Sequence, residues 1–194
     1  MKLRGLYAIT PDGADIAAKV QQALDGGIAL LQYRRKAAAS AAEAKELLSL
    51  ARRRGVPFIV NDDVELALEI GADGVHLGRE DGDLASIRKR MEGKLLGASC
   101  YNQLGLATTA VAAGADYIAF GSVFASPTKP GAVKAPLSLF GNRYSKPVCA
   151  IGGITLQNAP QAIAAGADMV AVISDLFDAP DIARRAAAYR KLFQ

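Results

Sequence analysis

The tripeptide Gly-Ala-Asp occurs three times in this chain of 194 residues, and each copy stands directly before a short apolar run. The copies begin at Gly71, Gly114 and Gly166, and a degenerate copy, Gly26-Gly27, precedes a fourth apolar run. They recur roughly every 45 to 50 residues, which is long enough for a helix, a strand and a second helix, so they mark alternate strands of a repeated unit. Glycine suits the position just after a helix, where the backbone needs a positive φ, and the apolar run is the strand that follows.

Each interval holds one more apolar run, and a further run lies near the N-terminus, so eight strands are predicted in alternation with helices. We expect the strands at residues 6–9, 29–31, 58–60, 74–77, 95–98, 117–120, 148–151 and 169–173. Eight strand–helix units predict a compact (β/α)₈ TIM barrel of the α/β class, with residues 1–194 as a single domain. Because the chain is short for such a barrel, we place a truncated helix between Pro136 and Tyr144.

The net charge of +4 is compatible with two kinds of partner. Basic runs at residues 52–54 and 88–90 could contact nucleic acid, but no nucleic-acid-binding motif accompanies them. Cations are also favoured at the C-terminal ends of helices, where both runs are expected. We therefore expect no nucleic-acid partner, and small anionic substrates explain a basic balance equally well.

The two cysteines, Cys100 and Cys149, form no Cys-x-x-Cys motif, so neither a zinc site nor a redox pair is indicated. No apolar segment follows the charged residues at the N-terminus, and we expect no signal peptide. No stretch approaches the roughly 20 apolar residues of a membrane span. We therefore expect a cytoplasmic protein without a membrane partner.

Polar side chains follow the predicted strands, and barrels of this kind place their chemistry at the carboxyl ends of the strands. Asp62 follows the third strand and Asp81 the fourth, opposite Arg34, Lys36 and Lys129. Carboxylates without a cluster of imidazoles or thiolates favour Mg²⁺, which usually completes its shell with substrate phosphates. Asp62 could instead cap the next helix, and Asp81 could be a solvated loop acid. Their place on adjacent strands, opposite the three cations, favours a metal–diphosphate site.

Three further features have both a structural and a functional interpretation. Gly152-Gly153, before a predicted helix, could be a plain tight turn, but its place after the seventh strand favours a phosphate site. His76, the only histidine, is more typical of a packed, hydrogen-bonded residue than of a catalyst. Cys100, near the rim, is more typical of a small apolar filler than of a reactive thiol.

Several segments together resemble the thiamine phosphate synthase family, over nearly the whole chain. Residues 32–36, Gln-Tyr-Arg-Arg-Lys, resemble the family's Gln-x-Arg-x-Lys motif. Asn61-Asp62 and residues 76–81 resemble its metal-bearing segments, residues 120–131 its signature after the sixth strand, and residues 150–154 its phosphate turn. The motifs are specific jointly, and most of them are weak singly.

This resemblance implies a transferase of thiamine biosynthesis. It would join 4-amino-2-methyl-5-hydroxymethylpyrimidine diphosphate to 4-methyl-5-(2-hydroxyethyl)thiazole phosphate, giving thiamine phosphate and pyrophosphate by Mg²⁺-assisted, dissociative loss of pyrophosphate. The resemblance makes Asp62 and Asp81 the metal ligands, and Lys129, Arg34 and Ser99 catalytic. The implied substrate-binding residues are Gln32, Arg34, Lys36, Asn61, Ser99, Ser126, Thr128, Lys129, Gly153, Ile173 and Ser174. The implied partners are these small molecules, and a homo-oligomer is compatible with the sequence.

Some positions depart from the family pattern. Arg35 stands where an acid is common, Ser126 replaces the usual Thr, and Cys100 stands where related thiazole tautomerases carry a catalytic His. The missing His argues against a tautomerase, whereas both Asp positions argue for the synthase. Two alternatives stay open: another phosphate-binding barrel enzyme, such as a tautomerase or a sugar-phosphate isomerase, and a non-catalytic ligand-binding barrel. Dependence on Mg²⁺ separates the synthase from the other enzymes.

Overall fold

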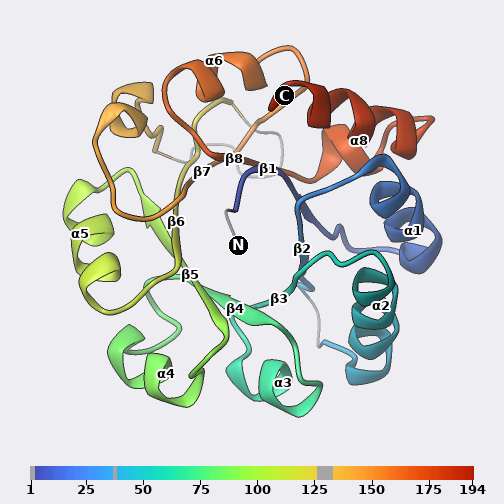
Figure 1. Cartoon of the computed structure of the whole chain (residues 1–194), viewed down its shortest axis with the longest axis horizontal. Coiled ribbons are helices and arrows are strands. Elements are labelled where there is room, and N and C mark those ends of the chain that lie inside the picture. The colour runs from blue at the N-terminus through green and yellow to red at the C-terminus, as the bar shows by residue number, and fades with distance from the viewer. Residues whose placement is uncertain (1–2, 37–38, 126–132) are drawn as a thin grey trace.

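Eight parallel strands close into a barrel in the order β1 to β8, with β8 pairing back to β1 (Figure 1). The computed structural model describes residues 3–36, 39–125 and 133–194. The strands are β1 (Gly5–Ile9), β2 (Leu30–Tyr33), β3 (Phe58–Asn61), β4 (Gly74–Leu77), β5 (Leu95–Tyr101), β6 (Tyr117–Phe120), β7 (Val148–Ile151) and β8 (Met169–Val172). The predicted (β/α)₈ barrel is confirmed.

Helices form a ring around the barrel and cover its outer face (Figure 1). They are α1 (Ile16–Gly26), α2 (Ala41–Arg53), α3 (Val64–Glu69), α4 (Leu84–Arg90), α5 (Leu104–Ala112), the 3₁₀ helix η1 (Leu137–Gly141), α6 (Ala159–Ala164), α7 (Ser174–Phe177) and α8 (Ile182–Lys191). Four of them start with a side-chain N-cap, in which the side chain accepts a hydrogen bond from an N–H of the first turn. These caps are Ser40, Asp63, Asp83 and Asp181.

Two apolar layers result, because successive side chains of a strand point to opposite faces. One layer fills the barrel and includes Tyr7, Ile59, Tyr117 and Met169. The other lies between the strands and the helices and holds most of the buried residues. Gly97 makes room inside the barrel, since a Cβ there would collide with the ring of Tyr117 and with His76.

The glycines and the aspartates of the repeated tripeptide each have a structural task. Gly71, Gly114 and Gly166 all have positive φ, at 69°, 92° and 116°, as expected after a helix. The aspartates accept hydrogen bonds from the start of the preceding strand: Asp73 from the Phe58 N–H at 2.8 Å, and Asp168 from the Val148 N–H at 3.0 Å. Asp116 likewise accepts from the Leu96 N–H at 2.9 Å. We call these three interactions the aspartate hooks, and the sequence analysis did not foresee them.

The structure agrees with the sequence-based expectation in one further element and differs from it in others. The expected truncated helix is present as η1. Helix α6 begins at Ala159, after a turn at residues 156–158. Strand β5 runs on to Tyr101, and its pairing with β6 shifts register between Ser99 and Tyr101. Helix α7 was not predicted, since four residues are too few to show a helical pattern.

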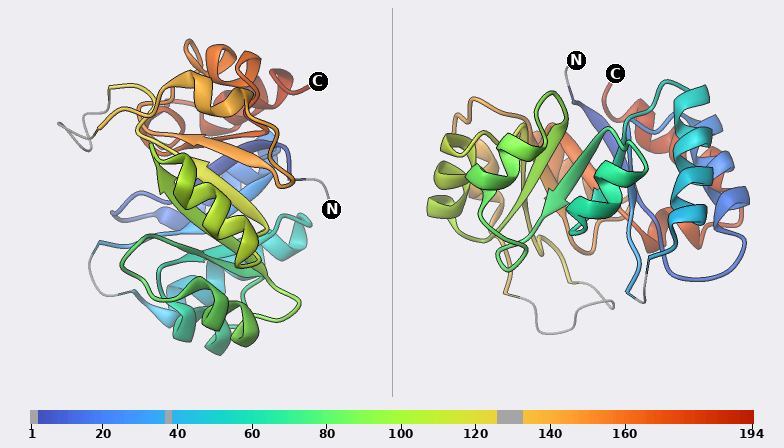
Figure 2. Two further views of the ribbon diagram at one scale, coloured as in Figure 1. Left: turned by 90° about the vertical axis from the view of Figure 1, so that its left-hand side faces the viewer. Right: turned by 90° about the horizontal axis from the view of Figure 1, so that it is seen from below.

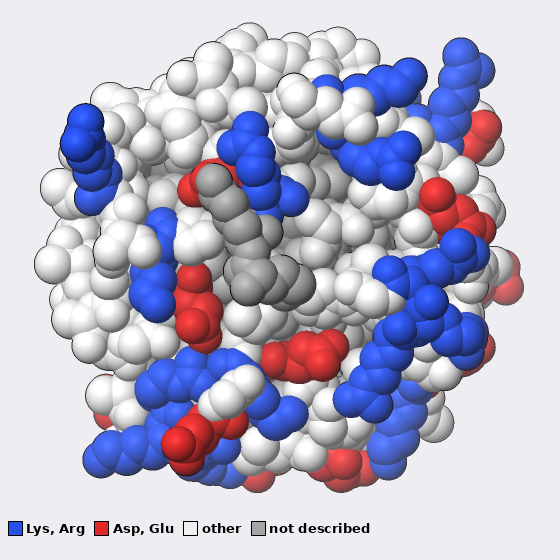
Figure 3. Space-filling model, viewed as in Figure 1, with Lys and Arg blue, Asp and Glu red and all other residues white. Residues whose placement is uncertain are grey.

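The two basic runs lie at the ends of α2 and α4, as expected. Several of their cations are paired with acids: Arg54 with Asp25, and Arg88 with Asp116 at 2.9 Å. Figure 3 shows one end of the barrel, where basic and acidic side chains are interspersed around the edge. The helix-end interpretation therefore accounts for both runs. Within the described residues, no helix has the length and apolar character needed to cross a membrane.

Gly97 and Gly105 provide a matched test of the packing. We expect Gly97→Ala to destabilise the protein by about 1–3 kcal/mol, because the new methyl group overpacks the barrel interior. Gly105, exposed in α5 with open space where a Cβ would lie, serves as the control. Gly105→Ala should stabilise by about 0.5–1 kcal/mol through helix propensity. Urea unfolding of both variants checks this, and equal effects would contradict it.

Candidate active site

The candidate site lies at the carboxyl ends of the strands, opposite the end of the barrel that carries both chain termini (Figure 2). Gln32, Asn61 and Ser99 come from β2, β3 and β5, and His76 from β4. Gln32 is 2% exposed and His76 is 7% exposed, so both point into the closed barrel rather than out to solvent. Strand closure thus brings predicted site residues from three strands, together with His76, to one rim.

The segment after β2 is fixed to the end of β1 by a pair of hydrogen bonds. The fully buried Thr10 hydroxyl donates to the Arg34 carbonyl at 3.0 Å and accepts from the Arg34 N–H at 2.9 Å. Lys36, two residues after Arg34, is exposed, and its backbone N–H donates to the Asp12 carboxylate at 3.0 Å. Burial and the neighbouring Asp81 raise the pKa of Asp62, and the charge of the nearby Arg34 guanidinium opposes this rise. The backbone of Arg34 is therefore fixed at the rim.

Arg35, the departure from the family pattern, belongs to the outer layer instead. Its guanidinium pairs with Glu43 at 2.5 Å and donates to the Pro11 carbonyl at 2.7 Å. Tyr33 also turns outward and donates to Glu43 at 2.8 Å. The expected alternation of Gln32 and Tyr33 to opposite faces is confirmed, and Arg35 adds no charge to the site.

Asp62 and Asp81 form a carboxylate pair at the rim. Partial burial of the Asp62 carboxylate, and then its contact with Asp81, raise the pKa of Asp62 to about 6. Asp62 has a left-handed φ of 64°, and its carboxylate accepts from the Asn61 amide at 2.5 Å. Asp81 accepts from the Gly78 N–H at 2.6 Å. The helix-cap interpretation of Asp62 is wrong, because Asp63 caps α3 by accepting from the Leu66 N–H at 2.9 Å.

This pair suits a hard divalent cation. Two adjacent carboxylates repel each other, and a bound cation relieves the repulsion that raises the Asp62 pKa. Within the described part of the chain no three His, Cys, Asp or Glu side chains gather as a metal site. Mg²⁺ needs only one or two carboxylates when substrate phosphates supply its other ligands. The residues present therefore fit the predicted metal.

A chain of four hydrogen bonds crosses the barrel just below the rim. The Gln32 amide donates to the Tyr7 hydroxyl at 2.6 Å, and the Tyr7 and Tyr117 hydroxyls are 2.7 Å apart. The Tyr117 hydroxyl lies 3.1 Å from Nδ1 of His76, and Nε2 of His76 lies 2.9 Å from Oγ of Ser99. We call these five residues the barrel relay. Its two ends, Gln32 and Ser99, were predicted as site residues, whereas the roles of Tyr7 and Tyr117 were missed.

His76 is the packed, hydrogen-bonded histidine that the sequence favours. Its contact with Ser99 forms a Ser–His pair at the rim, which the sequence analysis did not foresee. Burial lowers the pKa of His76 to about 4, although the Asp81 charge acts in the opposite direction. Its second nitrogen faces the Tyr117 hydroxyl rather than a carboxylate. A base this weak, without an orienting acid, does not activate a serine nucleophile.

The turn after β7 contains glycine for steric reasons. Gly152 and Gly153 have φ of 95° and 63°, and a Cβ on either would collide with Ser122 or with the Ala125 carbonyl of the loop after β6. Helix α6 begins only at Ala159, so the expectation of a helix directly behind the two glycines is wrong. The tight-turn interpretation of the two glycines thus has a structural basis, and phosphate binding stays a prediction.

Helix α7 places Ser174 at its first position and Ile173 at its N-cap, directly after β8. Asp175, which the sequence analysis missed, ties this helix to its surroundings. Its Oδ2 accepts from the Leu156 N–H at 3.2 Å, from Arg185 at 2.8 Å and from the Tyr189 hydroxyl at 2.7 Å. One carboxylate thus joins the segment after β7, the segment after β8 and α8. Its only sequence signal is its place just after a strand end.

Three predicted site residues, Ser126, Thr128 and Lys129, lie outside the described residues. Both cysteines are fully buried, Cys100 in the outer layer and Cys149 inside the barrel. Burial raises the pKa of Cys100 to about 12 and the pKa of Cys149 still higher. The apolar-filler interpretation of Cys100 is confirmed.

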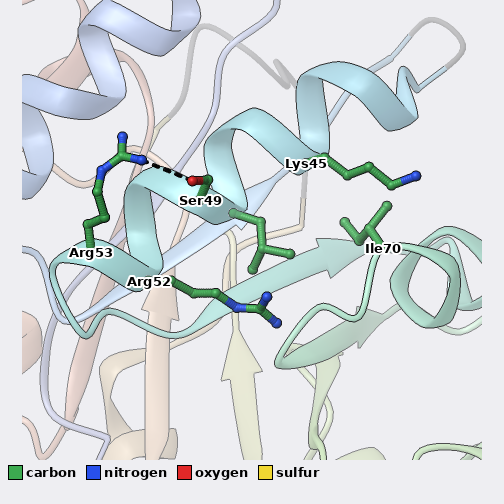
Figure 4. Close-up of a pocket in the computed structure, with 6 residues that line it drawn as sticks. Lys45, Ser49, Arg52, Arg53 and Ile70 are labelled. Atoms are coloured by element: carbon green, nitrogen blue, oxygen red, sulfur yellow. Dashed lines mark hydrogen bonds between the residues drawn. The ribbon is translucent and has the colours of Figure 1, made fainter.

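Figure 4 shows a surface hollow of about 510 Å³ on the outer face of α2, lined by Lys45, Ser49, Arg52, Arg53 and Ile70 among others. It is remote from the strand ends, and its cations are already engaged. Arg53 donates to Ser49 at 2.9 Å, Arg52 donates to the Gly71 carbonyl at 2.7 Å, and Lys45 pairs with Glu69 at 3.1 Å. We therefore place the site at the barrel mouth.

Fold and site together define a (β/α)₈-barrel protein with charged and hydroxyl side chains on the rim at the carboxyl ends of its strands. Comparison with known proteins narrows this class. The sequence matches the model of the thiamine monophosphate synthase family over residues 6–176. The chain therefore belongs to this family, a family of transferases in thiamine biosynthesis.

Relatives match along nearly their whole length. A thiamine-phosphate synthase of Aromatoleum aromaticum is 58% identical over 202 residues, which cover 99% of this chain and 97% of the relative. One from Chromobacterium violaceum is 54% identical over 196 residues, covering 96% and 95%. The structure of a thiamine phosphate pyrophosphorylase from Pyrococcus furiosus has a TM-score of 0.86 at 34% identity, covering 99% of this chain and 96% of that one.

The three hydrogen bonds that Asp175 accepts form a clamp between the segments after β7 and β8. Substitutions of Asp175 and Asp178 test this clamp. We expect Asp175→Asn to destabilise the protein by about 1–3 kcal/mol, because three donors lose a charged acceptor. Asp178→Asn, at an exposed position next to the same helix, should change stability by less than about 0.5 kcal/mol. Thermal unfolding measures both. Equal stability of the two variants would show that the clamp contributes nothing.

Thiol labelling tests the cysteine environments. A thiol stays protonated below its pKa, and burial raises the pKa of Cys100 to about 12, so Cys100 is protonated at pH 8. We expect a thiol reagent to leave both cysteines unmodified in the folded protein and to label both after unfolding in guanidinium. Rapid labelling of the folded protein would contradict the burial described above.

Proposed function

We propose that this protein joins the pyrimidine diphosphate to the thiazole phosphate, giving thiamine phosphate and pyrophosphate. The observation that carries the proposal is the Asp62–Asp81 pair beside Arg34, on the barrel rim of a chain 58% identical to a thiamine-phosphate synthase. The proposed reaction needs a place that binds both a metal cation and an anionic diphosphate. The carboxylates can hold a cation, and the Arg34 guanidinium can face the diphosphate.

We propose Mg²⁺ as the cation, held by Asp62 and Asp81. When bound, it would neutralise charge on the departing diphosphate. Arg34, whose backbone is fixed by Thr10, would face the same leaving group without a cost of reorganisation. Lys36 and Asn61 would bind the same diphosphate.

The chemistry then needs no nucleophile from the protein. The bond between the methylene carbon and the diphosphate oxygen breaks, and pyrophosphate leaves with the electron pair. The thiazole nitrogen attacks the cationic carbon and forms the new carbon–nitrogen bond. Gln32 and Ser99 would orient the pyrimidine during both steps. The weak basicity of His76 agrees with this route, because it gives Ser99 no means to attack first.

The thiazole phosphate would be held on the other side of the rim. Gly153, Ile173 and Ser174 would bind it, since the loops after the seventh and eighth strands of such barrels recurrently bind phosphate. By family resemblance, Ser126 and Thr128 would lie nearby, and Lys129 would follow the negative charge that grows on the leaving group. Cytoplasmic location and a homo-oligomer stay predictions from the sequence.

Adjacent aspartates make a matched pair of variants. Asp62→Asn should lower kcat/KM for pyrophosphate release by about 100-fold to 1,000-fold, because a preorganised charge-stabilising group is lost. Asp63→Asn should keep nearly full activity, since asparagine caps helices as well as aspartate does. The assay supplies both substrates with Mg²⁺ and measures pyrophosphate. Full turnover in EDTA would refute the metal assignment, and no turnover with Mg²⁺ would leave a tautomerase or a non-catalytic barrel.

A further inference from the structure

The barrel relay has a property that follows from counting its protons. Four contacts link Gln32, Tyr7, Tyr117, His76 and Ser99, and each contact has room for one hydrogen. Tyr7 and Tyr117 each carry one hydroxyl hydrogen, and a neutral imidazole carries one N–H. All four contacts can therefore hold one hydrogen each in only two arrangements. In each of them every donor points the same way along the relay.

In one direction Gln32 donates its amide N–H to Tyr7, as the structure has it. Tyr7 must then donate to Tyr117, and Tyr117 to Nδ1 of His76. The remaining imidazole hydrogen lies on Nε2 and points to Oγ of Ser99. Gln32 consequently keeps its carbonyl oxygen for a ligand, and Ser99 keeps its hydroxyl hydrogen.

In the other direction every donor and acceptor is exchanged. Gln32 would accept from Tyr7, Ser99 would donate to His76, and the imidazole hydrogen would lie on Nδ1. A mixed arrangement leaves at least one contact with two hydrogens or with none. Both tyrosines are about 99% or more buried, so water cannot repair such a defect. Unpaired buried groups are costly, and the relay therefore switches as one unit.

We propose that Tyr7 and Tyr117 are positioning residues that make Gln32 and Ser99 act as one acceptor and one donor for the pyrimidine. This rests on the proposed function. Strands β2 and β5 lie on roughly opposite sides of the barrel, so the two side chains meet a ligand from opposite sides. In an aminopyrimidine the amino group at C4 donates, and ring nitrogen N1, directly across the ring, accepts. A ring with acceptors at both positions matches neither direction of the relay.

The single histidine of the chain makes the proton direction measurable. Nitrogen-15 NMR of the folded protein distinguishes an imidazole with hydrogen on Nε2 from one with hydrogen on Nδ1. We expect the Nε2–H form alone in the unaltered protein. In Tyr7→Phe, which cuts the relay two residues away from His76, we expect both forms. Tyr33→Phe removes a buried hydroxyl from the outer face of β2 and should leave the Nε2–H form alone.

Ligand selectivity gives the second measurement. The amino compound and an analogue with methoxy in place of the amino group, both as diphosphates with Mg²⁺, are titrated without the thiazole substrate. We expect the methoxy analogue to bind about tenfold or more weakly to the unaltered protein and to Tyr33→Phe, because it leaves a polar group unpaired. In Tyr7→Phe the Gln32 amide can rotate independently, and the ratio should fall at least about threefold.

An Nδ1–H imidazole in the unaltered protein, or a Tyr7→Phe variant with unchanged tautomer and selectivity, would overturn the proposal. If Tyr7→Phe fails to fold, Tyr117→Phe cuts the relay at the next residue and must meet the same expectations. The NMR result does not need turnover. Failure of pyrophosphate release with the expected tautomer would refute the proposed function alone, whereas turnover with the wrong tautomer would refute the relay alone.

Discussion

Closure of the strand ladder is the constraint on which the rest of the structure depends. Once β8 pairs with β1, no strand edge among the eight is left open, and the interior is sealed from water at all but its mouth. Polar groups inside must then pair with one another, and within the described chain no buried side-chain nitrogen or oxygen lacks a partner. Tyr7, Tyr117 and His76 form their hydrogen-bonded chain because closure leaves them no other partners.

The rim built on this barrel has two sides with different chemistry. The strands β2 to β4 bring a guanidinium and a carboxylate pair together, which suits a diphosphate and its metal. The strands β7 and β8 end in a glycine turn and a short helix, joined by the Asp175 carboxylate. A reaction between two anionic substrates needs such separation, because their phosphates repel each other while the reacting carbon and nitrogen must meet. The proposed reaction fits this division.

The sequence predicted the barrel because its repeat is local: one glycine, one aspartate and one apolar run mark three of the four alternate strands, and a degenerate copy marks the fourth. It predicted the rim residues because the carboxyl ends of parallel strands meet at one edge. It could not choose between Asp62 and Asp63 as the helix cap, since both precede the same helix. The contact between Tyr7 and Tyr117 spans 110 residues, and alternation along a strand tells which face a side chain takes but not its partner. Family resemblance supplied most individual site roles.

The aspartate hooks also bear on how the chain reaches its fold. Each hook joins partners only 15 to 20 residues apart, so β3 with β4, β5 with β6 and β7 with β8 can each assemble from a short segment. The seam between β1 and β8 is different, because it brings together the two ends of the chain. There Gly26 of α1 packs directly against Ala183 and Ala186 of α8, without space for a Cβ. Contacts between residues close in sequence form quickly and contacts between the chain ends form slowly, so we expect the closing of this seam to limit the rate at which the barrel folds.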